Sequence, residues 1–464
     1  MAAESGLESI LAVPDFLPPP AGRDRGPTAA ADLERFLAAA DVALLVVLHA
    51  FKCGAVLDQA ADLACDGNRT SAVPTVLVLG GTDVNVDATS APDKAETLTR
   101  RAAAVDRVVA FATSMLEAAP PGSLPPHKTR IIPQGVSLPS EVDPTPEGGS
   151  DAPEDEAEAM LSDESSRIFS SEESVPRTPP THSGPSLHAA LGLPATVPVM
   201  LLPAGLRPVK DVLWALDAVE RAAAGAASPG GVPSSPPSPS PSSPTPTHPP
   251  FVLAIVGPVL DPAYAEAVDA RLVGARSVVR LPPVERRTMV RYMADAAAVV
   301  NTSESEGQSG ALLEAAAVGT PIVARDIPGN RSLLDLVHGS AENAAVAAAG
   351  AAFVSYGDSS SRCSRDARGS VLDLESYEVH PCGVLCPTPE AFAAAIVDAF
   401  VPVGKSSPHA GPSGGVDGVS AAVCAAARRA RVGADGLAAF ERHAWTNMVR
   451  EVVGERCGAK AGKE

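Results

Sequence analysis

The hydrophobic positions of this chain fall into short apolar runs that alternate with longer stretches of mixed polarity. Nine runs have the length and composition of buried strands, and they cover residues 42–48, 73–79, 108–112, 131–133, 199–203, 251–256, 278–281, 298–301 and 321–324. Between them, helices are expected at residues 211–226, 264–272 and 309–318. Strands that are apolar on both faces are typical of parallel sheets covered by helices on each side. The alternation therefore predicts an α/β fold in two blocks that separate near residue 140.

The two blocks predict two Rossmann-like domains facing a cleft, with disordered insertions between and within them. The first domain is assigned to residues 1–138 and the second to residues 198–400. Residues 139–197 are acidic and rich in Ser and Pro, and residues 228–250 are mostly Pro, Ser and Thr. Segments of this composition bury too little apolar surface to offset the entropy lost on ordering, so both are predicted to be disordered.

Residues 356–388 are predicted to form a surface loop within the second domain. This loop contains His380, Cys382 and Cys386, which could suggest a zinc site. Because a fourth ligand is not evident and the spacing is unusual for zinc, we expect these three side chains to lie on the surface. We expect no other metal site, since no Asp-x-Asp pair follows a predicted strand.

The net charge of −19 is concentrated in one segment of the chain. Residues 141–175 hold twelve carboxylates and a single base, Arg167, so they account for −11 of this charge. The remainder is only mildly acidic and shows no basic stripe, and aromatic residues make up 3% of the chain. A nucleic acid is therefore not expected as a partner.

The cysteines and the N-terminal residues bear on where the protein functions. Seven cysteines at irregular spacing, without a Cys-x-x-Cys pair, do not favour a disulfide framework. Residues 1–22 contain no basic residue, which differs from a secretory signal or a transit peptide. The longest purely apolar run, residues 42–48, is too short to cross a bilayer. These observations predict a cytoplasmic protein without a transmembrane segment.

Polar residues follow several of the predicted strands and form the candidate site. Ligands of open α/β sheets bind beyond the carboxyl ends of the parallel strands. In the first block, His49 follows one strand, and Gly81 and Asp83 follow the next. In the second block, residues 205–211 and 301–310 occupy the corresponding positions. The sequence therefore predicts that a ligand binds in the cleft between the blocks.

Two glutamates separated by seven residues, Glu306 and Glu314, give the sharpest signal. Glu314 lies in a predicted helix whose neighbouring residues are all apolar, and an isolated buried carboxylate costs several kcal/mol unless it meets a partner or a ligand. A hydrogen bond to a ligand hydroxyl would satisfy it. The alternatives are a solvated helix face for Glu314 and, for Glu306, the end of a capping box that begins at Ser303.

The loop around Glu306 leads into the helix predicted at residues 309–318. A helix N-terminus presents free backbone N–H groups and the positive end of the helix dipole, so it favours an anion. The residues that would let a phosphate approach are Gln308, Ser309, Gly310 and Ala311. A second anion site is predicted at Gly205, Arg207 and Lys210, where the two cations could clamp a diphosphate. Two solvated bases remain an alternative explanation there.

Taken together, these residues resemble the nucleotide-sugar domain of retaining glycosyltransferases of group 1 (family 4), which have the GT-B fold. Glu306 and Glu314 match the Glu-x7-Glu motif of that family. The resemblance implies that Glu306 contacts hydroxyls of the donor sugar and that Glu314 contacts the ribose of the nucleotide. It also implies that Arg207 and Lys210 contact the diphosphate.

The resemblance extends through five more segments, at residues 48–54, 79–87, 110–115, 131–136 and 324–330. It implies that His49 lies near the reacting centre, with Gly81 and Asp83 on the same side of the cleft. Residues 401–464 are expected to comprise a Gly/Ser linker and helices that cross back to the first domain. Members of the family usually begin with a strand and a Gly-rich loop, which residues 1–22 do not show, so the first domain is expected to start incomplete.

The function implied by the resemblance is transfer of a sugar from a nucleoside diphosphate sugar to an unidentified acceptor. The transfer would retain the configuration of the sugar and would need neither a metal ion nor another cofactor. The expected catalytic residues are His49, Glu306 and Lys210. A fold does not fix a function, so two alternatives stay open: a non-catalytic sensor or scaffold that binds a sugar nucleotide, and a sugar-nucleotide epimerase of the same fold.

Overall fold

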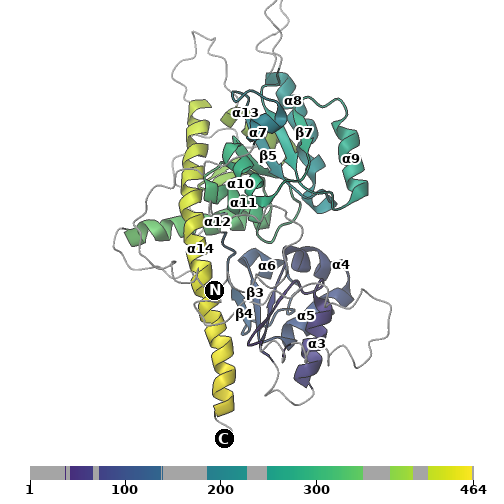
Figure 1. Ribbon diagram of the computed structural model, residues 1–464, viewed down its shortest axis with the longest axis vertical. Helices are drawn as coiled ribbons and strands as arrows, with labels where there is room; N and C mark the ends of the chain where they lie inside the picture. Colours follow the sequence, from purple (N-terminus) through teal and green to yellow (C-terminus); the bar gives the residue numbers. More distant parts are fainter. Residues whose placement is uncertain are drawn as a thin grey trace, which may run out of the picture.

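The computed structural model of the protein (Figure 1) describes residues 37, 42–65, 73–136, 138, 185–226, 248–348, 377–400 and 416–461. Its first domain is a four-stranded parallel sheet in the order β1-β2-β3-β4. The strands are β1 (Leu45–Leu48), β2 (Thr75–Val78), β3 (Arg107–Ala110) and β4 (Thr129–Ile131). The helical segments are α3 (Gly54–Cys65), η2 (Asp83–Asp87), α4 (Ala88–Ser90), α5 (Pro92–Ala104) and α6 (Thr113–Ala118). All four strands predicted for this block are present.

The second domain is a seven-stranded sheet in the order β10-β11-β9-β8-β5-β6-β7. Five of its six parallel strands were predicted: β5 (Val199–Pro203), β6 (Val252–Val256), β7 (Val278–Leu281), β8 (Ala298–Asn301) and β9 (Ile322–Arg325). Its helical segments are α7 (Leu187–Leu191), η4 (Pro208–Lys210), η5 (Val212–Ala215), α8 (Leu216–Ala226), α9 (Pro262–Leu272), α10 (Arg286–Asp295), α11 (Gly310–Val318), α12 (Pro328–Ala348), α13 (Pro389–Phe400) and α14 (Val416–Ala461).

The strand order of the second domain places its ligand-binding edge. The chain runs outward through β6 and β7 on one side of β5, and through β8 and β9 on the other. The order therefore reverses between β5 and β8, and the loops that leave these two strands diverge there. Crevices at such switch points hold the ligands of doubly wound sheets. The loop after β5 and the loop after β8 are the two segments for which the sequence predicts anion binding.

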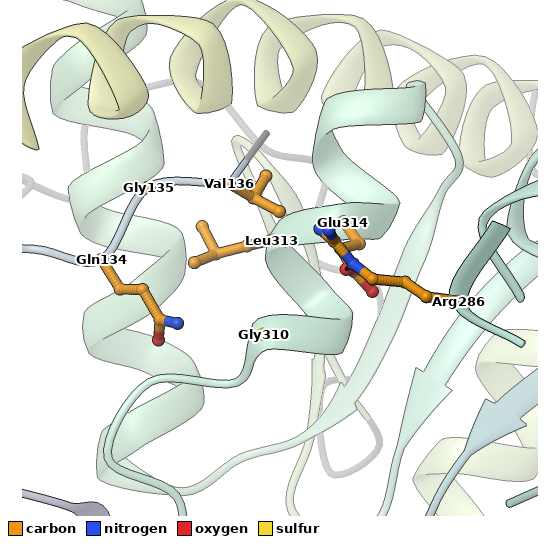
Figure 2. Close-up of a pocket in the computed structure, with 7 residues that line it drawn as sticks. All are labelled: Gln134, Gly135, Val136, Arg286, Gly310, Leu313 and Glu314. Atoms are coloured by element: carbon orange, nitrogen blue, oxygen red, sulfur yellow. Dashed lines mark hydrogen bonds and ion pairs between the residues drawn. The ribbon is translucent and has the colours of Figure 1, made fainter. Parts of the chain in front are cut away.

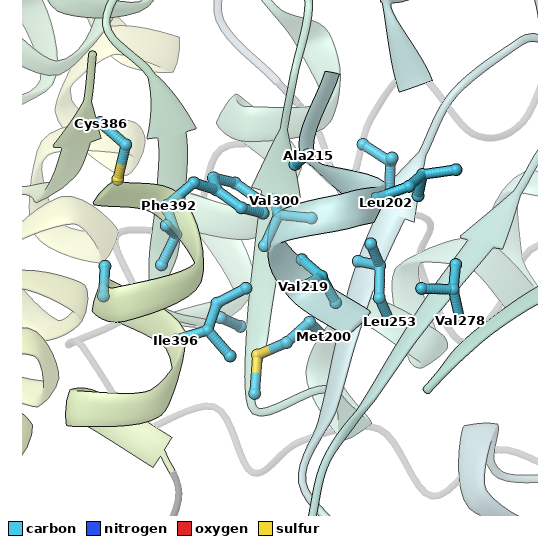
Figure 3. Close-up of a cluster of buried hydrophobic side chains, with 14 of the residues drawn as sticks. Met200, Leu202, Ala215, Val219, Leu253, Val278, Val300, Cys386, Phe392 and Ile396 are labelled. Atoms are coloured by element: carbon cyan, nitrogen blue, oxygen red, sulfur yellow. The ribbon is translucent and has the colours of Figure 1, made fainter. Parts of the chain in front are cut away.

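Alternate residues of β5 point to opposite faces of the sheet, and each face has its own core. Met200 and Leu202 pack with α8 and α13 on one face, through residues that include Val219 and Phe392 (Figure 3). The intervening Leu201 belongs to the core on the other face, which includes residues of α10, α11 and α12. This two-sided burial explains why the strands of the second domain are continuous apolar runs.

The prediction of a surface loop at residues 356–388 is wrong for residues 377–388, while residues 356–376 lie outside the described residues. Here β10 (Glu378–His380) and β11 (Gly383–Cys386) form an antiparallel hairpin, and β11 also pairs with β9. His380, Cys382 and Cys386 are consequently buried. Burial, helped by the charge of Asp326, raises the pKa of the Cys386 thiol.

The disordered insertion predicted at residues 139–197 also ends earlier than expected. Residues 185–197 are folded and contain α7, whose Leu187 is fully buried against the second core. The hydroxyl of Ser186 accepts a hydrogen bond from the N–H of Ala189 and so caps this helix, and Gly192 ends it with a positive φ of 64°. The rest of this insertion, and residues 228–247 of the Pro/Ser segment, lie outside the described residues.

Helix α14 packs on both domains (Figure 1). Ala430 and Leu437 are part of the core of the second domain. Further along, Trp445 and Met448 pack against Val78 and other residues of the first sheet. In the part of the chain that the structure describes, no helix, this one included, combines the length and apolarity needed to span a membrane.

Candidate active site

The loops after β5 and β8 are tied to each other at the switch point. The backbone N–H of Glu304 donates to the carbonyl oxygen of Val209 at 3.0 Å, and the Thr302 hydroxyl donates to the carbonyl oxygen of Lys210 at 2.9 Å. Asp211 has a positive φ of 37° and accepts a salt bridge from Arg325 at 2.8 Å. These contacts fix the position of Lys210 relative to the loop that carries Glu306.

Lys210 and Glu306 form an ion pair at the centre of this arrangement. Lys210 Nζ lies 2.6 Å from Glu306 Oε1, and both side chains are mostly buried. The same oxygen accepts hydrogen bonds from the Ser303 hydroxyl at 2.7 Å and from Asn301 Nδ2 at 3.2 Å. No described residue hydrogen bonds to Oε2. The carboxylate is therefore held by one oxygen and can offer the other to a ligand.

The capping-box explanation for Glu306 does not hold. A capping box needs the glutamate side chain to accept a hydrogen bond from the backbone N–H of Ser303. In the structure that N–H donates to Asn301 Oδ1 instead, at 3.1 Å. The Ser303 hydroxyl donates to the carboxylate itself. Glu306 is thus a hydrogen-bond acceptor that its neighbours hold in position, in the loop that follows β8.

Arg207 is the second cation of the loop after β5. Its side chain is half-buried, and its Nε is buried without a hydrogen-bond partner. No salt bridge joins it to any described carboxylate. A guanidinium without a counterion beside a second cation is an arrangement that a phosphate or diphosphate would satisfy. The alternative of two solvated bases does not describe this pair, because Lys210 is only 20% exposed and bonded to Glu306.

Helix α11 begins four residues after Glu306 and has no side-chain cap. Ser309 is its N-cap residue and is buried, but its side chain does not accept a hydrogen bond from the first turn. Gly310 is exposed, and a Cβ atom built on it would meet nothing. The first turn, including Ala311, is therefore open to an anion from the side that lacks a side chain.

Glu314 has a partner that the sequence did not indicate. Arg286, at the start of α10, donates to Glu314 Oε1 at 2.8 Å. Glu314 is only 16% exposed, so the explanation as a solvated helix face fails, but the premise that it lacks a protein partner also fails. The two residues line a cavity of about 340 Å³ together with Gln134, Gly135, Val136, Gly310 and Leu313. Figure 2 shows Arg286 and Glu314 side by side on one flank of this cavity.

Gln308 joins the two domains. Its Oε1 accepts a hydrogen bond from the backbone N–H of Gln134 at 2.7 Å, and its Nε2 donates to the carbonyl oxygen of Gln134 at 3.2 Å. Both ends of the amide are thus engaged by the segment that follows β4. The sequence predicted that this residue contacts the nucleotide sugar, and in the structure its amide bonds to the backbone of the first domain.

Gly81 and Gly307 form a second contact across the cleft. A Cβ atom on Gly81 would lie 2.3 Å from the backbone nitrogen of Gly307, so this approach requires glycine at position 81. Nearby, Asn85 Nδ2 donates to the carbonyl oxygen of Glu306 at 3.3 Å. The loop with Glu306 therefore lies directly against the loop that follows β2.

His49 and Asp83 lie on the first domain's side of this contact. Asp83 is fully buried, and its carboxylate accepts the backbone N–H groups of Gly80 at 2.8 Å and Ala50 at 2.9 Å. His49 has a positive φ of 65°, and its Nδ1 lies 3.5 Å from Asp83 Oδ2. Burial by itself raises the pKa of Asp83. The His49 side chain and these N–H groups together lower the pKa by more than burial raises it, so it lies below its ordinary value. Asp83 thus anchors the loop that presents His49.

Replacing Asp83 with asparagine is expected to lower the free energy of unfolding by about 1–3 kcal/mol. The carboxylate accepts the N–H groups of Gly80 and Ala50 on Oδ2 and that of Phe51 on Oδ1 at 3.4 Å, whereas an amide offers only one acceptor oxygen and no charge. The folded-state pKa of Asp83 is lowered, so its stabilising effect is complete above its ordinary pKa of 3.8 and is lost as the pH falls through the folded-state value. Urea unfolding between pH 7 and pH 3 should show a constant difference from wild type that shrinks below about pH 4.

The matched control for that experiment is Asp87→Asn, at the end of the same helical segment, which should leave stability within about 0.5 kcal/mol of wild type. If Asp83→Asn is no less stable than this control at pH 7, Asp83 does not anchor the loop.

Among residues whose side chains are described, no group of three or more His, Cys, Asp or Glu is arranged to hold a metal ion. The polar groups described in the loops after β5 and β8 include Arg207, Lys210, the paired carboxylate of Glu306 and the N-terminus of α11. Such a set suits a ligand that carries both phosphates and hydroxyl groups.

Comparisons with known proteins agree with this chemistry. Residues 198–355 match the family described as Glycosyl transferases group 1. A Xenopus tropicalis protein named glycosyltransferase 1 domain-containing protein 1 is 25% identical over 300 residues, which cover 64% of this chain and 69% of that protein.

Solved structures share the fold. Anabaena Alr3699/HepE in complex with UDP matches with a TM-score of 0.51 and 13% identity, over 91% of this chain and 82% of that one. Sucrose-phosphate synthase from Thermosynechococcus elongatus matches with a TM-score of 0.50 and 14% identity, over 93% and 78% of the two chains. The two α/β domains described above accordingly have the GT-B fold.

Proposed function

We propose, on the premise that residues 198–355 belong to the group 1 glycosyl transferases, that this protein transfers a sugar from a nucleoside diphosphate sugar to an acceptor. We propose further that the transfer retains the configuration of the sugar and needs no metal ion. The observation that carries the proposal is the Lys210–Glu306 pair at the switch point, with Arg207 unpaired by any described carboxylate beside it.

The diphosphate is the part of the donor for which the site is best equipped. Lys210 keeps two N–H donors after its bond to Glu306, since an ammonium group has three. It can therefore bridge the carboxylate and a phosphate oxygen. Arg207 and the open first turn of α11 add two further positive groups. These groups take over the neutralising role that a metal ion would otherwise fill.

The reaction breaks the bond between the sugar carbon and the diphosphate oxygen and forms a bond from that carbon to an acceptor hydroxyl oxygen, whose proton passes to the departing diphosphate. Negative charge grows on the leaving diphosphate as the first bond breaks. Lys210 would stabilise that charge, because its contacts hold it in position before the reaction begins, and Arg207 would add to this effect. Glu306 Oε2 would accept a hydrogen bond from a hydroxyl of the sugar, and His49 would approach the sugar from the first domain.

The nucleoside is assigned to the cavity lined by Glu314 and Arg286. Glu314 uses Oε1 for Arg286, which leaves Oε2 for a ribose hydroxyl. UDP and UDP-glucose are the first ligands to test, because HepE has been solved in complex with UDP and glucose.

Replacing Glu314 with alanine is expected to weaken UDP binding by about 10- to 100-fold without any acceptor, since a hydrogen bond to a charged group contributes about 1.5–3 kcal/mol. Isothermal titration calorimetry measures this directly. Glu304→Ala is the matched control, because Glu304 is an exposed glutamate of the preceding loop and should leave the affinity unchanged. Equal affinities for folded Glu314→Ala and wild type would contradict the ribose contact.

A further inference from the structure

Asn330 is a buried side chain that none of the proposed donor contacts uses. It lies in the first turn of α12 and is fully buried. Its Nδ2 donates to Asn301 Oδ1 at 3.0 Å and to the carbonyl oxygen of Arg325 at 3.0 Å. Both partners are acceptors, so the amide of Asn330 can take only one orientation. Its own Oδ1 is buried without a hydrogen-bond partner.

The orientation of Asn301 follows from the same logic. Asn301 Oδ1 accepts Nδ2 of Asn330 and also the backbone N–H of Ser303, at 3.1 Å. A backbone N–H can only donate, so this contact confirms which atom of the Asn301 amide is the oxygen, and the bond from Asn330 adds to its hold on that orientation. The Nδ2 of Asn301 must then face Glu306, and it donates to Oε1 at 3.2 Å. The hydrogen bonds therefore run in one direction, from Asn330 through Asn301 to Glu306.

The consequence concerns which oxygen of Glu306 is available. Asn301, Ser303 and Lys210 all donate to Oε1. If Asn301 could turn its amide, its oxygen would face the carboxylate and repel it, and the carboxylate would lose one of three bonds that set its rotation. Two buried amides locked against each other prevent this turn.

We propose that Asn330 is a positioning residue, which acts through Asn301 to hold Glu306 with Oε2 directed at the donor sugar. This inference rests on the proposed function, since it assumes that a sugar hydroxyl meets Oε2. A purely structural role for Asn330 would be to cap the turn between β9 and α12 through the carbonyl oxygen of Arg325. The two roles differ in what they affect: positioning changes sugar recognition, whereas capping changes only stability.

The test compares binding of UDP and GDP with binding of UDP-glucose and GDP-mannose, by calorimetry on the full chain. The sugar increment is the ratio of the affinity for a nucleotide sugar to the affinity for its free nucleoside diphosphate, and it reports the contact between the sugar and Glu306. In Asn330→Ala this increment should fall about tenfold, while affinity for the free diphosphates stays within about twofold. The control is Val219→Ala on α8, on the other face of the sheet, which should lower stability and leave the increment intact.

A second readout uses coupling. Because Asn330 acts through Asn301, the double variant Asn301→Ala/Asn330→Ala should lose no more of the sugar increment than Asn301→Ala alone. Additive losses, or an increment in Asn330→Ala equal to that of Val219→Ala, would overturn the positioning role and leave the proposed function standing. A wild-type protein that binds none of the four ligands would contradict the proposed function itself, and this inference with it.

Discussion

Replacing Lys210 with alanine is expected to lower turnover by about a hundred- to a thousand-fold, since removing a preorganised donor to a developing negative charge costs about 3–4 kcal/mol. Lys210 Nζ is held 2.6 Å from Glu306 by loops that are bonded to each other, so it meets the leaving diphosphate without rearrangement. Donor affinity should fall less, because only the charge that grows during bond breaking is specific to the transition state. Steady-state kinetics with the donor that the protein accepts measures both quantities.

Arg207→Ala provides the comparison for this result and should reduce turnover less than Lys210→Ala. Arg207 has no bond to Glu306, and its buried Nε has no hydrogen-bond partner, so its side chain is held less firmly than that of Lys210. If Lys210→Ala changes only the Michaelis constant, the lysine contacts the phosphate equally in the ground state, and its proposed catalytic role is wrong.

Trp445→Ala is expected to lower the free energy of unfolding by about 3–5 kcal/mol, as is typical when a large buried aromatic side chain is truncated. Trp445 packs with Met448 and Val452 of α14 against Val78 and Val109 of the first sheet. The cavity left behind cannot close easily, because both neighbouring strands are fully paired in the sheet. Urea unfolding followed by circular dichroism measures the change.

The control for Trp445 lies two residues away on the same helix. Asn447 is exposed and bonds only to His443 among the described residues, so Asn447→Ala should change stability by no more than about 0.5 kcal/mol. A loss below about 1 kcal/mol for Trp445→Ala would show that α14 is not held on the first domain by this contact.

All nine expected strands have a counterpart in the structure. Strands such as β2, β6 and β8 were predictable because burial on both faces makes them apolar runs. The half-buried β4 was placed less well, since Thr129–Ile131 shares only Ile131 with the predicted run at residues 131–133. The hairpin of β10 and β11 was missed because its seven strand residues follow a long polar segment and include His380 and Cys386, which were interpreted as a failed zinc site. Helix α7 was missed for a similar reason. It has only five residues and directly follows a Ser- and Pro-rich segment, so composition outweighed its caps.

The candidate site was only partly predictable. The sequence marked Lys210, Glu306 and Glu314 as chemistry-bearing, because each lies beyond a strand or within an apolar helix. It could not show that Lys210 and Glu306, 96 residues apart, form an ion pair. Nor could it show that α10 brings Arg286 to Glu314. Such pairings depend on how strands that are distant in the sequence are arranged in the fold. The local pattern of residues carries no information about that arrangement.

Gln308 is a second residue whose partner could not be predicted from the local sequence. Its place between Glu306 and the start of α11 favoured a donor contact, and no local feature indicated a partner in the first domain. Its amide instead bonds the backbone of Gln134, which is 174 positions earlier. A glycine such as Gly307 permits another backbone segment to come close. The sequence does not show which segment this is, and only the fold identifies it as the loop that contains Gly81.

The proposed sugar transfer is tested most directly by mass spectrometry of the purified protein incubated with a panel of nucleotide sugars, with Lys210→Ala as the comparison. If the protein transfers sugars, one donor should release its nucleoside diphosphate, with the sugar hydrolysed or transferred, and this release should be largely lost in Lys210→Ala. A donor whose sugar is converted to another sugar while still attached would indicate an epimerase. Binding without any chemical change would indicate a sensor, and either result would contradict the proposal that this protein transfers sugars.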